Sequence, residues 1–172
     1  NKTTIICGST WPKDEALLAK YIKENPNYNY IIAPHEMQHI NELKKQTNAL
    51  LFSKADSTNI SNSNVLIIDS IGILSNIYKY GDLAYIGGGF GSGIHNILEA
   101  VAYGLPVVFG PNYQKFNEAT ELIKQKGAIS ISNYTELTSA VDCFNAFDKS
   151  IAINYIQENS GATTKILDSF TT

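Results

Sequence analysis

Gly87-Gly88-Gly89-Phe90-Gly91-Ser92-Gly93-Ile94-His95-Asn96-Ile97-Leu98-Glu99-Ala100 follows directly on an apolar run, Leu83 to Ile86. Five of the chain's 12 glycines lie in the first seven positions of this stretch. Glycine at this density lets the backbone adopt positive φ angles and lets a ligand approach the main chain closely. The start of a helix attracts anions through its unpaired N–H groups and the positive end of its dipole. The stretch therefore predicts a strand, a glycine loop and a helix that together bind an anion, most simply a phosphate group.

The overall composition is typical of one globular domain of ordinary size. The 172 residues are 44% hydrophobic and 17% charged, with a formal net charge of -3. This charge argues against nucleic acid or a membrane surface as a partner bound through bulk charge. No apolar run approaches the roughly 20 residues needed to span a bilayer. The first residues are typical of a strand rather than of a signal peptide.

The methionine and the cysteines bear on the origin of the chain. The single methionine is Met37, and the chain does not begin with one, which favours a piece of a longer protein. Cys7 falls in a predicted strand and Cys143 in a predicted helix, so they form no disulfide framework. We expect both to be reduced thiols in the core, in a cytosolic compartment.

Apolar runs that end in turn residues alternate along the chain with segments of helical spacing. The four consecutive aliphatic residues from Val65 to Ile68 are typical of a strand covered on both faces, as in a parallel sheet. Strands are predicted at 3–7, 28–33, 50–53, 65–68, 83–86, 106–109 and 128–131. Helices are predicted from Asp14 to Asn25, over 36–49 and 72–80, from the glycine loop to Tyr103, and over 117–126, 135–147 and 151–170, the last with a break near Ser160-Gly161.

This alternation predicts one α/β domain over residues 1–172, a doubly wound, Rossmann-like and mostly parallel sheet with helices on both faces. Ligands of such sheets bind at the carboxyl ends of the strands. The loops at Gly8, Pro34, Asp69 and Gly87 leave strands at that edge, so we expect them to converge.

The glycine stretch matches neither of two common phosphate-binding motifs. The dinucleotide fingerprint G-x-G-x-x-G fails in every register, and no Lys-Ser/Thr pair follows as in a P-loop. In the predicted helix beyond it, an apolar stripe leaves Asn96 and Glu99 on the other side. Glu99 is suited to accept two hydrogen bonds from a ribose diol, while the N–H groups of Gly93, Ile94 and His95 bind the phosphate. The alternative is a simple tight turn, with Glu99 only complementing the helix dipole.

His35-Glu36-Met37-Gln38-His39 matches H-E-x-x-H, the signature of zinc peptidases. That motif belongs inside a helix, whereas this one directly follows a strand and Pro34, and no convincing third ligand follows. We therefore expect no metal site, with one histidine near the ligand cleft and the other on a solvated helix face.

Two other strand ends carry groups that suit a nucleotide. Ser9 and Thr10 offer hydroxyls to a ligand, or alternatively cap the first helix. The main chain of 69–73 is placed to contact a nucleobase edge, or alternatively forms a plain turn. No nucleophile–base pair or carboxylate dyad has convincing spacing, so the sequence indicates nucleotide binding without catalytic groups.

At these residues the chain resembles a known family. Gly93-Ile94-His95-Asn96-Ile97-Leu98-Glu99-Ala100 and Gly104-Leu105-Pro106-Val107-Val108-Phe109-Gly110-Pro111 look like the core motif of the 3-deoxy-D-manno-octulosonic acid (Kdo) transferases of Gram-negative lipopolysaccharide synthesis. The resemblance extends to Gly8-Ser9-Thr10-Trp11-Pro12 with Asp14-Glu15, to Pro34-His35 and to 69–74, and so covers essentially the whole chain.

The resemblance implies a two-domain glycosyltransferase of the GT-B architecture, with this chain similar to its C-terminal, donor-binding half. The implied donor is CMP-Kdo and the implied acceptor is the lipid A precursor. The catalytic carboxylate and the membrane anchor would belong to the missing N-terminal half, at the cytoplasmic side of the inner membrane. No further cofactor is implied, and this fragment alone is expected to be inactive.

The resemblance also assigns donor contacts to individual residues. Asn96 and Glu99 would hold the CMP, Ser9 and Thr10 would line the phosphate side, and 71–74 would lie along the cytidine. The full predicted donor set is Ser9, Thr10, Pro34, His35, Ile71, Gly72, Ile73, Leu74, Gly93, Ile94, His95, Asn96 and Glu99.

Two residues depart from the family pattern. The family usually has Arg where this chain has His35, and commonly Glu where it has Ile73. Arginine binds phosphate bidentately and stays charged, whereas a histidine near neutral pH binds it weakly and in a pH-dependent way. The sequence leaves three other functions open: a UDP-sugar-dependent GT-B transferase or 2-epimerase, a non-catalytic nucleotide-binding module, and a zinc hydrolase.

Overall fold

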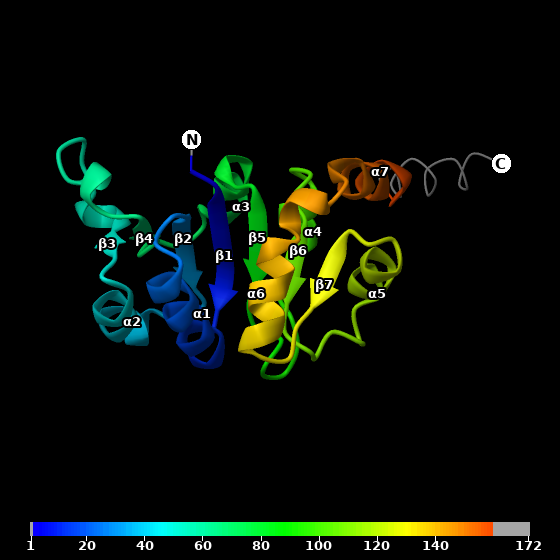
Figure 1. The fold of residues 1–172 in the computed structure, drawn as a ribbon, viewed down its shortest axis with the longest axis horizontal. Helices are drawn as coiled ribbons and strands as arrows, with labels where there is room; N and C mark the ends of the chain where they lie inside the picture. The colour runs from blue at the N-terminus through cyan, green and yellow to red at the C-terminus, as the bar shows by residue number, and fades with distance from the viewer. Residues whose placement is uncertain (1, 160–172) are drawn as a thin grey trace, which may run out of the picture.

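A computed structural model describes residues 2–159. Its centre is a seven-stranded sheet in the order β3-β4-β2-β1-β5-β6-β7, in which every pair of neighbours is parallel (Figure 1). The strands are β1 Thr4–Thr10, β2 Asn29–Pro34, β3 Leu50–Leu51, β4 Val65–Ile67, β5 Leu83–Ile86, β6 Val107–Phe109 and β7 Ala128–Ser130. The predicted doubly wound, Rossmann-like α/β fold is confirmed.

The strand order reverses between β1 and β5. From β1 the chain adds β2 beside it and then the edge strand β3, inserts β4 between β3 and β2, and returns to place β5 on the other side of β1. The loops that follow β1 and β5 therefore leave the sheet at its topological switch point, where ligands of open α/β sheets bind.

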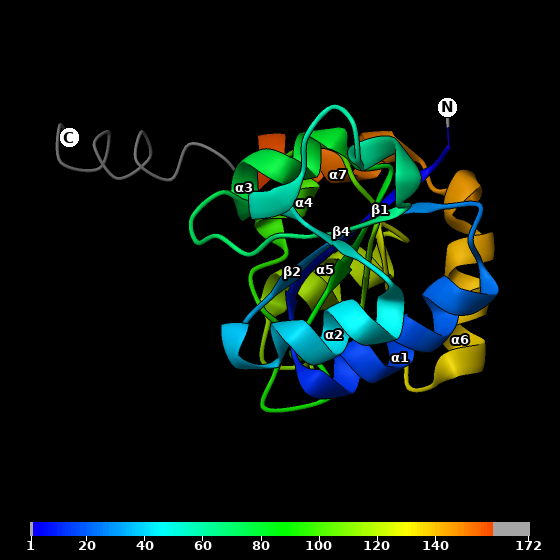
Figure 2. The same ribbon diagram turned by 90° about the vertical axis from the view of Figure 1, so that its left-hand side faces the viewer.

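Helices cover both faces of the sheet, because successive strand residues point to opposite sides. Ile5 and Cys7 pack with α1 (Pro12–Glu24), α2 (Ile40–Thr47) and α6 (Tyr134–Asp142). Ile6 packs in the second core, with α3 (Leu74–Ile77), α4 (Leu98–Val101), α5 (Asn117–Lys124) and α7 (Lys149–Asn159). Figure 2 shows α1, α2 and α6 on one side of the sheet and α3, α4 and α7 on the other.

Short 3₁₀ helices complete the elements, at Met37–His39, Phe52–Lys54, Ile60–Asn62, Tyr78–Tyr80 and Phe144–Ala146. The first of them corrects the predicted helix over 36–49: Glu36 is extended, so α2 begins only at Ile40. Another corrects the predicted strand over 50–53, which ends at Leu51 where a 3₁₀ turn begins. A third lies in the connection between β3 and β4.

Two helix starts also differ from the prediction. The first helix begins at Pro12 rather than after Asp14, since proline is favoured at the first helical position. The helix after the glycine loop is only Leu98–Val101. The predicted helix start around Ile94 is wrong, because residues 94–97 run over the core in a non-helical conformation.

Of the two cysteines, Cys7 is buried as expected, but Cys143 is exposed, so its prediction as a core thiol is wrong. The predicted break near Ser160-Gly161 and the remainder of that helix lie outside the described residues. Among the helices that the structure describes, none is long and apolar enough to cross a membrane.

Candidate functional site

Three loops meet at the switch point and bring three rings together. Trp11 follows β1, His35 follows β2 and His95 ends the glycine loop after β5. The ring centroids of Trp11 and His35 are 4.5 Å apart at an interplanar angle of 22°, and those of His35 and His95 are 4.4 Å apart. The backbone N–H of His35 donates to the carbonyl of Thr10 at 2.8 Å, which fixes this loop against the end of β1.

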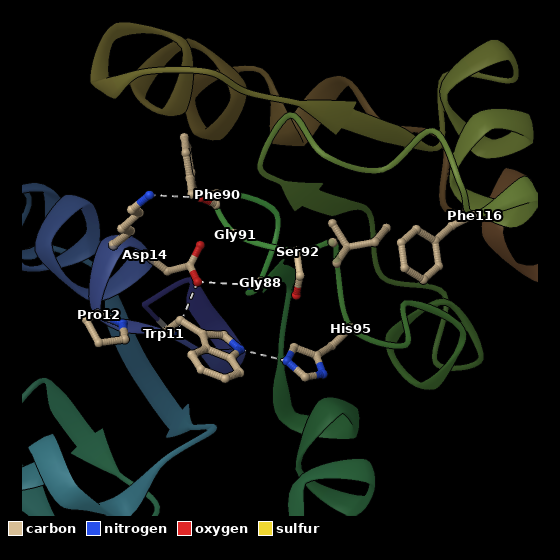
Figure 3. A pocket seen from close by; sticks show the side chains of 12 residues that line it. Trp11, Pro12, Asp14, Gly88, Phe90, Gly91, Ser92, His95 and Phe116 are labelled. Carbon is tan, nitrogen blue, oxygen red and sulfur yellow. Dashed lines mark hydrogen bonds between the residues drawn. The ribbon is translucent and has the colours of Figure 1, made fainter.

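The indole of Trp11 determines the tautomer of His95. Trp11 Nε1 donates to His95 Nε2 at 2.8 Å (Figure 3). Because an indole N–H is only a donor, Nε2 must accept, and the neutral imidazole then carries its proton on Nδ1. Burial lowers the pKa of His95, and the neighbouring His35 lowers it further, against an opposing effect of Asp14. His95 therefore presents a neutral Nδ1–H donor at neutral pH.

This geometry predicts a measurable titration. His95 should titrate below the ordinary histidine pKa of about 6.5 and show the nitrogen chemical shifts of the Nδ1–H tautomer at pH 7.5. A folded-state pKa below the unfolded one means that the unfolded chain binds more protons, so the free energy of unfolding should fall as pH drops below about 6.5. Long-range ¹H–¹⁵N NMR of the imidazole measures both quantities.

Two variants test the cause of the shift. His35→Asn removes the neighbouring imidazole and should raise the pKa of His95. Trp11→Phe keeps an aromatic ring but removes the indole donor, so the neutral His95 should no longer be restricted to the Nδ1–H tautomer. A His95 that is charged at pH 7.5, or that carries its proton on Nε2 in the wild type, would contradict the assignment.

The side chain of Asp14 holds the same loops together through hydrogen bonds. It is 0% exposed, and its carboxylate accepts hydrogen bonds from the backbone N–H groups of Trp11 and Gly88, both at 2.9 Å, and from the hydroxyl of Tyr85 at 2.7 Å. Burial and the neighbouring Asp14 raise the pKa of Tyr85, so this hydroxyl stays a donor. One carboxylate thus joins the start of α1, strand β5 and the glycine loop.

A cavity of about 530 Å³ opens beside these anchors. Figure 3 shows Trp11, Phe90, His95 and Phe116 around it, with the glycine loop as its wall. We call it the Trp11 cavity. Its lining residues are Trp11, Pro12, Lys13, Asp14, Gly88, Phe90, Gly91, Ser92, Gly93, Ile94, His95 and Phe116.

The predicted residues Ser9 and Thr10 lie at the end of β1. Ser9 has a φ of 52°, in the left-handed region. Thr10 is only 1% exposed, and its hydroxyl donates to Glu15 at 3.1 Å. The alternative in which these residues cap the first helix is wrong, because its N-cap is Trp11.

The structure brings Asn96 and Glu99 together at the start of α4. Asn96 Nδ2 donates to Glu99 Oε1 at 3.3 Å, and Asn96 Oδ1 accepts from the N–H of Leu98 at 3.0 Å. Burial, followed by the nearby Glu99 carboxylate, raises the pKa of the Tyr78 hydroxyl. Tyr78 in turn lies against Gly8, where an added Cβ would come within 2.0 Å of its oxygen. The turn that carries Tyr78 packs against α4, so Tyr78 lies between Gly8 of β1 and the helix that carries Glu99.

The N–H groups of the glycine loop are less free than the sequence suggests. His95 N donates to Gly87 O at 3.1 Å, and Gly93 N approaches Gly88 O at 3.4 Å. These two N–H groups therefore have partners within the loop and do not lie at a helix start, and phosphate binding by Gly93, Ile94 and His95 stays a prediction. Ile94 makes no backbone hydrogen bond among the described residues, but its side chain is buried.

The predicted loop over 71–74 follows β4. Ile71 is 90% exposed, and Gly72 has a φ of 87° with open space around it. Leu74 begins α3, and its side chain packs near Gly8: a Cβ added to Gly8 would lie 3.3 Å from Leu74 Cδ2. This loop thus lies beside the end of β1, on the same side as Tyr78. Pro34 ends β2 and precedes His35.

Several residues at this edge are missing from the predicted set: Trp11, Lys13, Asp14, Phe90 and Phe116. Trp11 carried a signal, since the chain's single tryptophan lies in the turn that follows the predicted strand 3–7. Phe116 carried none, because it comes from a loop distant in sequence. Among residues 2–159 no group of three or more histidine, cysteine, aspartate or glutamate side chains could hold a metal ion.

Known proteins resemble this chain in sequence and in fold. No family model matches it. A 3-deoxy-D-manno-octulosonic acid transferase of Aquifex aeolicus is 28% identical over 155 residues, covering 87% of this chain and 44% of that protein. One from Rickettsia bellii is also 28% identical, covering 99% of this chain and 44% of that protein. The chain thus spans less than half the length of these relatives.

The C-terminal CMP-Kdo binding domain of WaaA from Acinetobacter baumannii has the same fold, with a TM-score of 0.74 at 20% identity. The match covers 91% of this chain and 90% of that one. The similarity to Kdo transferases expected from the motifs is therefore confirmed over most of the chain, and the chain shares the fold of this binding domain.

Proposed function

We propose that this chain is the donor-binding half of a glycosyltransferase that transfers Kdo from CMP-Kdo to a lipid A precursor. The observation that carries the proposal is the pairing of Asn96 with Glu99 at the start of α4, a helix that packs against the Tyr78 turn beside Gly8 of β1. The similarity to Kdo transferases across both the glycine stretch and this edge supports the choice of donor.

In this function the donor set has complementary roles. Glu99 and Asn96 bind the ribose and the 71–74 loop lies along the base. His95 supplies a neutral N–H donor near the phosphate, and Ser9, Pro34 and His35 form the adjoining wall. Donors near a departing phosphate stabilise negative charge that develops in the transition state. The chain then needs no base of its own, because the catalytic carboxylate is assigned to an N-terminal domain.

Calorimetric titration with CMP tests the proposal. Glu99→Ala should weaken CMP binding at least tenfold, or about 1.4 kcal/mol, because a hydrogen bond to a charged group contributes about 1.5–3 kcal/mol. Glu158→Ala, an exposed carboxylate on α7, is the matched control and should leave the affinity unchanged. Absence of CMP binding by the wild type, or equal binding by Glu99→Ala, would refute the proposal.

The same titration separates the rival functions. A UDP-sugar transferase or epimerase should bind UDP more tightly than CMP, whereas we expect CMP to bind at least tenfold more tightly. A non-catalytic nucleotide module should bind nucleotide without any partner domain. Joined to an N-terminal acceptor domain, the chain is expected to transfer Kdo at the cytoplasmic face of the inner membrane, and alone to transfer none.

A further inference from the structure

We propose that the Trp11 cavity holds the sugar-acid part of the donor, with the Lys13 ammonium pairing with the sugar's carboxylate. This inference rests on the proposed function, and it adds a specificity-determining residue that the nucleotide contacts do not include. The cavity and the predicted nucleotide residues share Gly93, Ile94 and His95. None of Asn96, Glu99 and the 71–74 loop lines the cavity. The site therefore has two compartments that meet at the Trp11–His95 hydrogen bond.

The walls of the cavity suit a pyranose ring. Trp11, Phe90 and Phe116 contribute aromatic rings and Ile94 an aliphatic side chain. Apolar and aromatic walls with few polar groups are typical of sites for small ligands, and a volume of about 530 Å³ lies within the usual range of such sites. The C–H face of a sugar ring is suited to pack on such rings, while its hydroxyls reach the open side.

The polar groups of the cavity select the charge of the ligand. Among the lining residues of the cavity, Asp14 is the only one with a carboxylate, and this carboxylate already accepts three hydrogen bonds from the protein. Within residues 2–159 the Lys13 ammonium makes one hydrogen bond, a long one of 3.4 Å to the carbonyl of Phe90. The Ser92 hydroxyl and His95 Nδ1 make none in that range.

The groups left for a ligand are therefore donors, one of them a cation. A cation and two neutral donors favour an acceptor-rich anion. In CMP-Kdo the carboxylate is bonded to the same sugar carbon that carries the phosphate ester, so the two anionic groups are close neighbours. Lys13 lines the same cavity as the shared residues, on the side of Phe90, and is suited to bind the carboxylate, while His95 serves the phosphate side.

The single tryptophan makes the cavity observable. In ¹H–¹⁵N spectra of the 172-residue chain, free Kdo should shift the one indole N–H signal, that of Trp11, and CMP should bind independently. Lys13→Gln should weaken Kdo binding at least fivefold and change CMP affinity less than twofold. Lys23→Gln, on the last turn of the same helix and also exposed, is the control and should change neither. The methyl ester of Kdo, which lacks the carboxylate charge, should bind wild type as weakly as Kdo binds Lys13→Gln.

The outcomes separate this inference from the proposed function. The inference is overturned if CMP binds but Kdo does not shift the indole signal. It is also overturned if Lys13→Gln binds Kdo as tightly as the wild type does, and the wild type binds the methyl ester as tightly as Kdo, because the cavity is then not a carboxylate site. Failure of CMP itself to bind would refute the proposed function instead. A well-dispersed spectrum of each variant shows that it is folded.

Discussion

Replacing Asp14 with alanine is expected to lower the free energy of unfolding by about 3–5 kcal/mol, a large part of the stability of an ordinary domain. The carboxylate is completely buried and accepts three hydrogen bonds, two from backbone N–H groups and one from Tyr85. Its removal leaves all three donors without their acceptor, two of them in buried hydrogen bonds, and each unsatisfied buried donor costs about 1–3 kcal/mol.

Urea denaturation followed by circular dichroism measures this loss. Asp14→Asn keeps the shape and one acceptor oxygen, so it should lose less stability than alanine. Asp142→Ala, an exposed aspartate at the end of α6, should stay within about 0.5 kcal/mol of the wild type. Equal stability of Asp14→Ala and Asp142→Ala would show that the three hydrogen bonds do not hold the loops.

The fold followed from the sequence because its elements are short and strongly patterned. Val65 to Ile68 could only suit a strand covered on both faces, and β4 lies inside the sheet between β3 and β2. The run Leu83 to Ile86 ends at glycine and forms β5 over the same residues. Local pattern and tertiary structure agree at these strands, so the prediction holds.

The glycine stretch was harder to predict for a physical reason. Ile94 and Ile97 have helical spacing, and both are buried as a helix would require. Yet the N–H of His95 bonds to the carbonyl of Gly87, which closes a loop instead of a helical turn. Residue spacing alone does not distinguish a helix from a loop that buries the same side chains.

The sequence predicts that these loops converge, but it does not predict the ring contacts, because they join side chains from loops after three different strands. From the sequence, His35 is a weaker substitute for arginine. In the structure it stacks on Trp11 and beside His95, which a long, flexible arginine side chain would not do in the same way. The departure from the family pattern therefore accompanies a distinct wall of the site, built from a tryptophan and two imidazoles.

At the switch point of the sheet, Gly87→Ala is expected to lower the free energy of unfolding by about 3 kcal/mol or more. An added Cβ would lie 2.2 Å from the carbonyl oxygen of Ser9 and 2.6 Å from the Cα of Thr10. Both are backbone atoms of β1, to which Gly87 is also held by its N–H bond to Gly8 O at 2.9 Å. Overpacking usually costs about 1–3 kcal/mol, and here no side chain is available to move aside.

Gly91→Ala is the matched control from the same loop. There an added Cβ would meet only the carbonyl oxygen of Gly88, at 3.4 Å, and the backbone φ is not in the left-handed region. An alanine that fits should leave stability unchanged or raise it by about 0.4–1 kcal/mol, because it restricts the unfolded chain. In thermal and urea unfolding, Gly87→Ala should therefore be clearly less stable than the wild type, and Gly91→Ala at least as stable as the wild type. If Gly87→Ala unfolds like Gly91→Ala, β1 and β5 do not approach as closely at the switch point as the structure has them, and the placement of Trp11 against His95 loses its support.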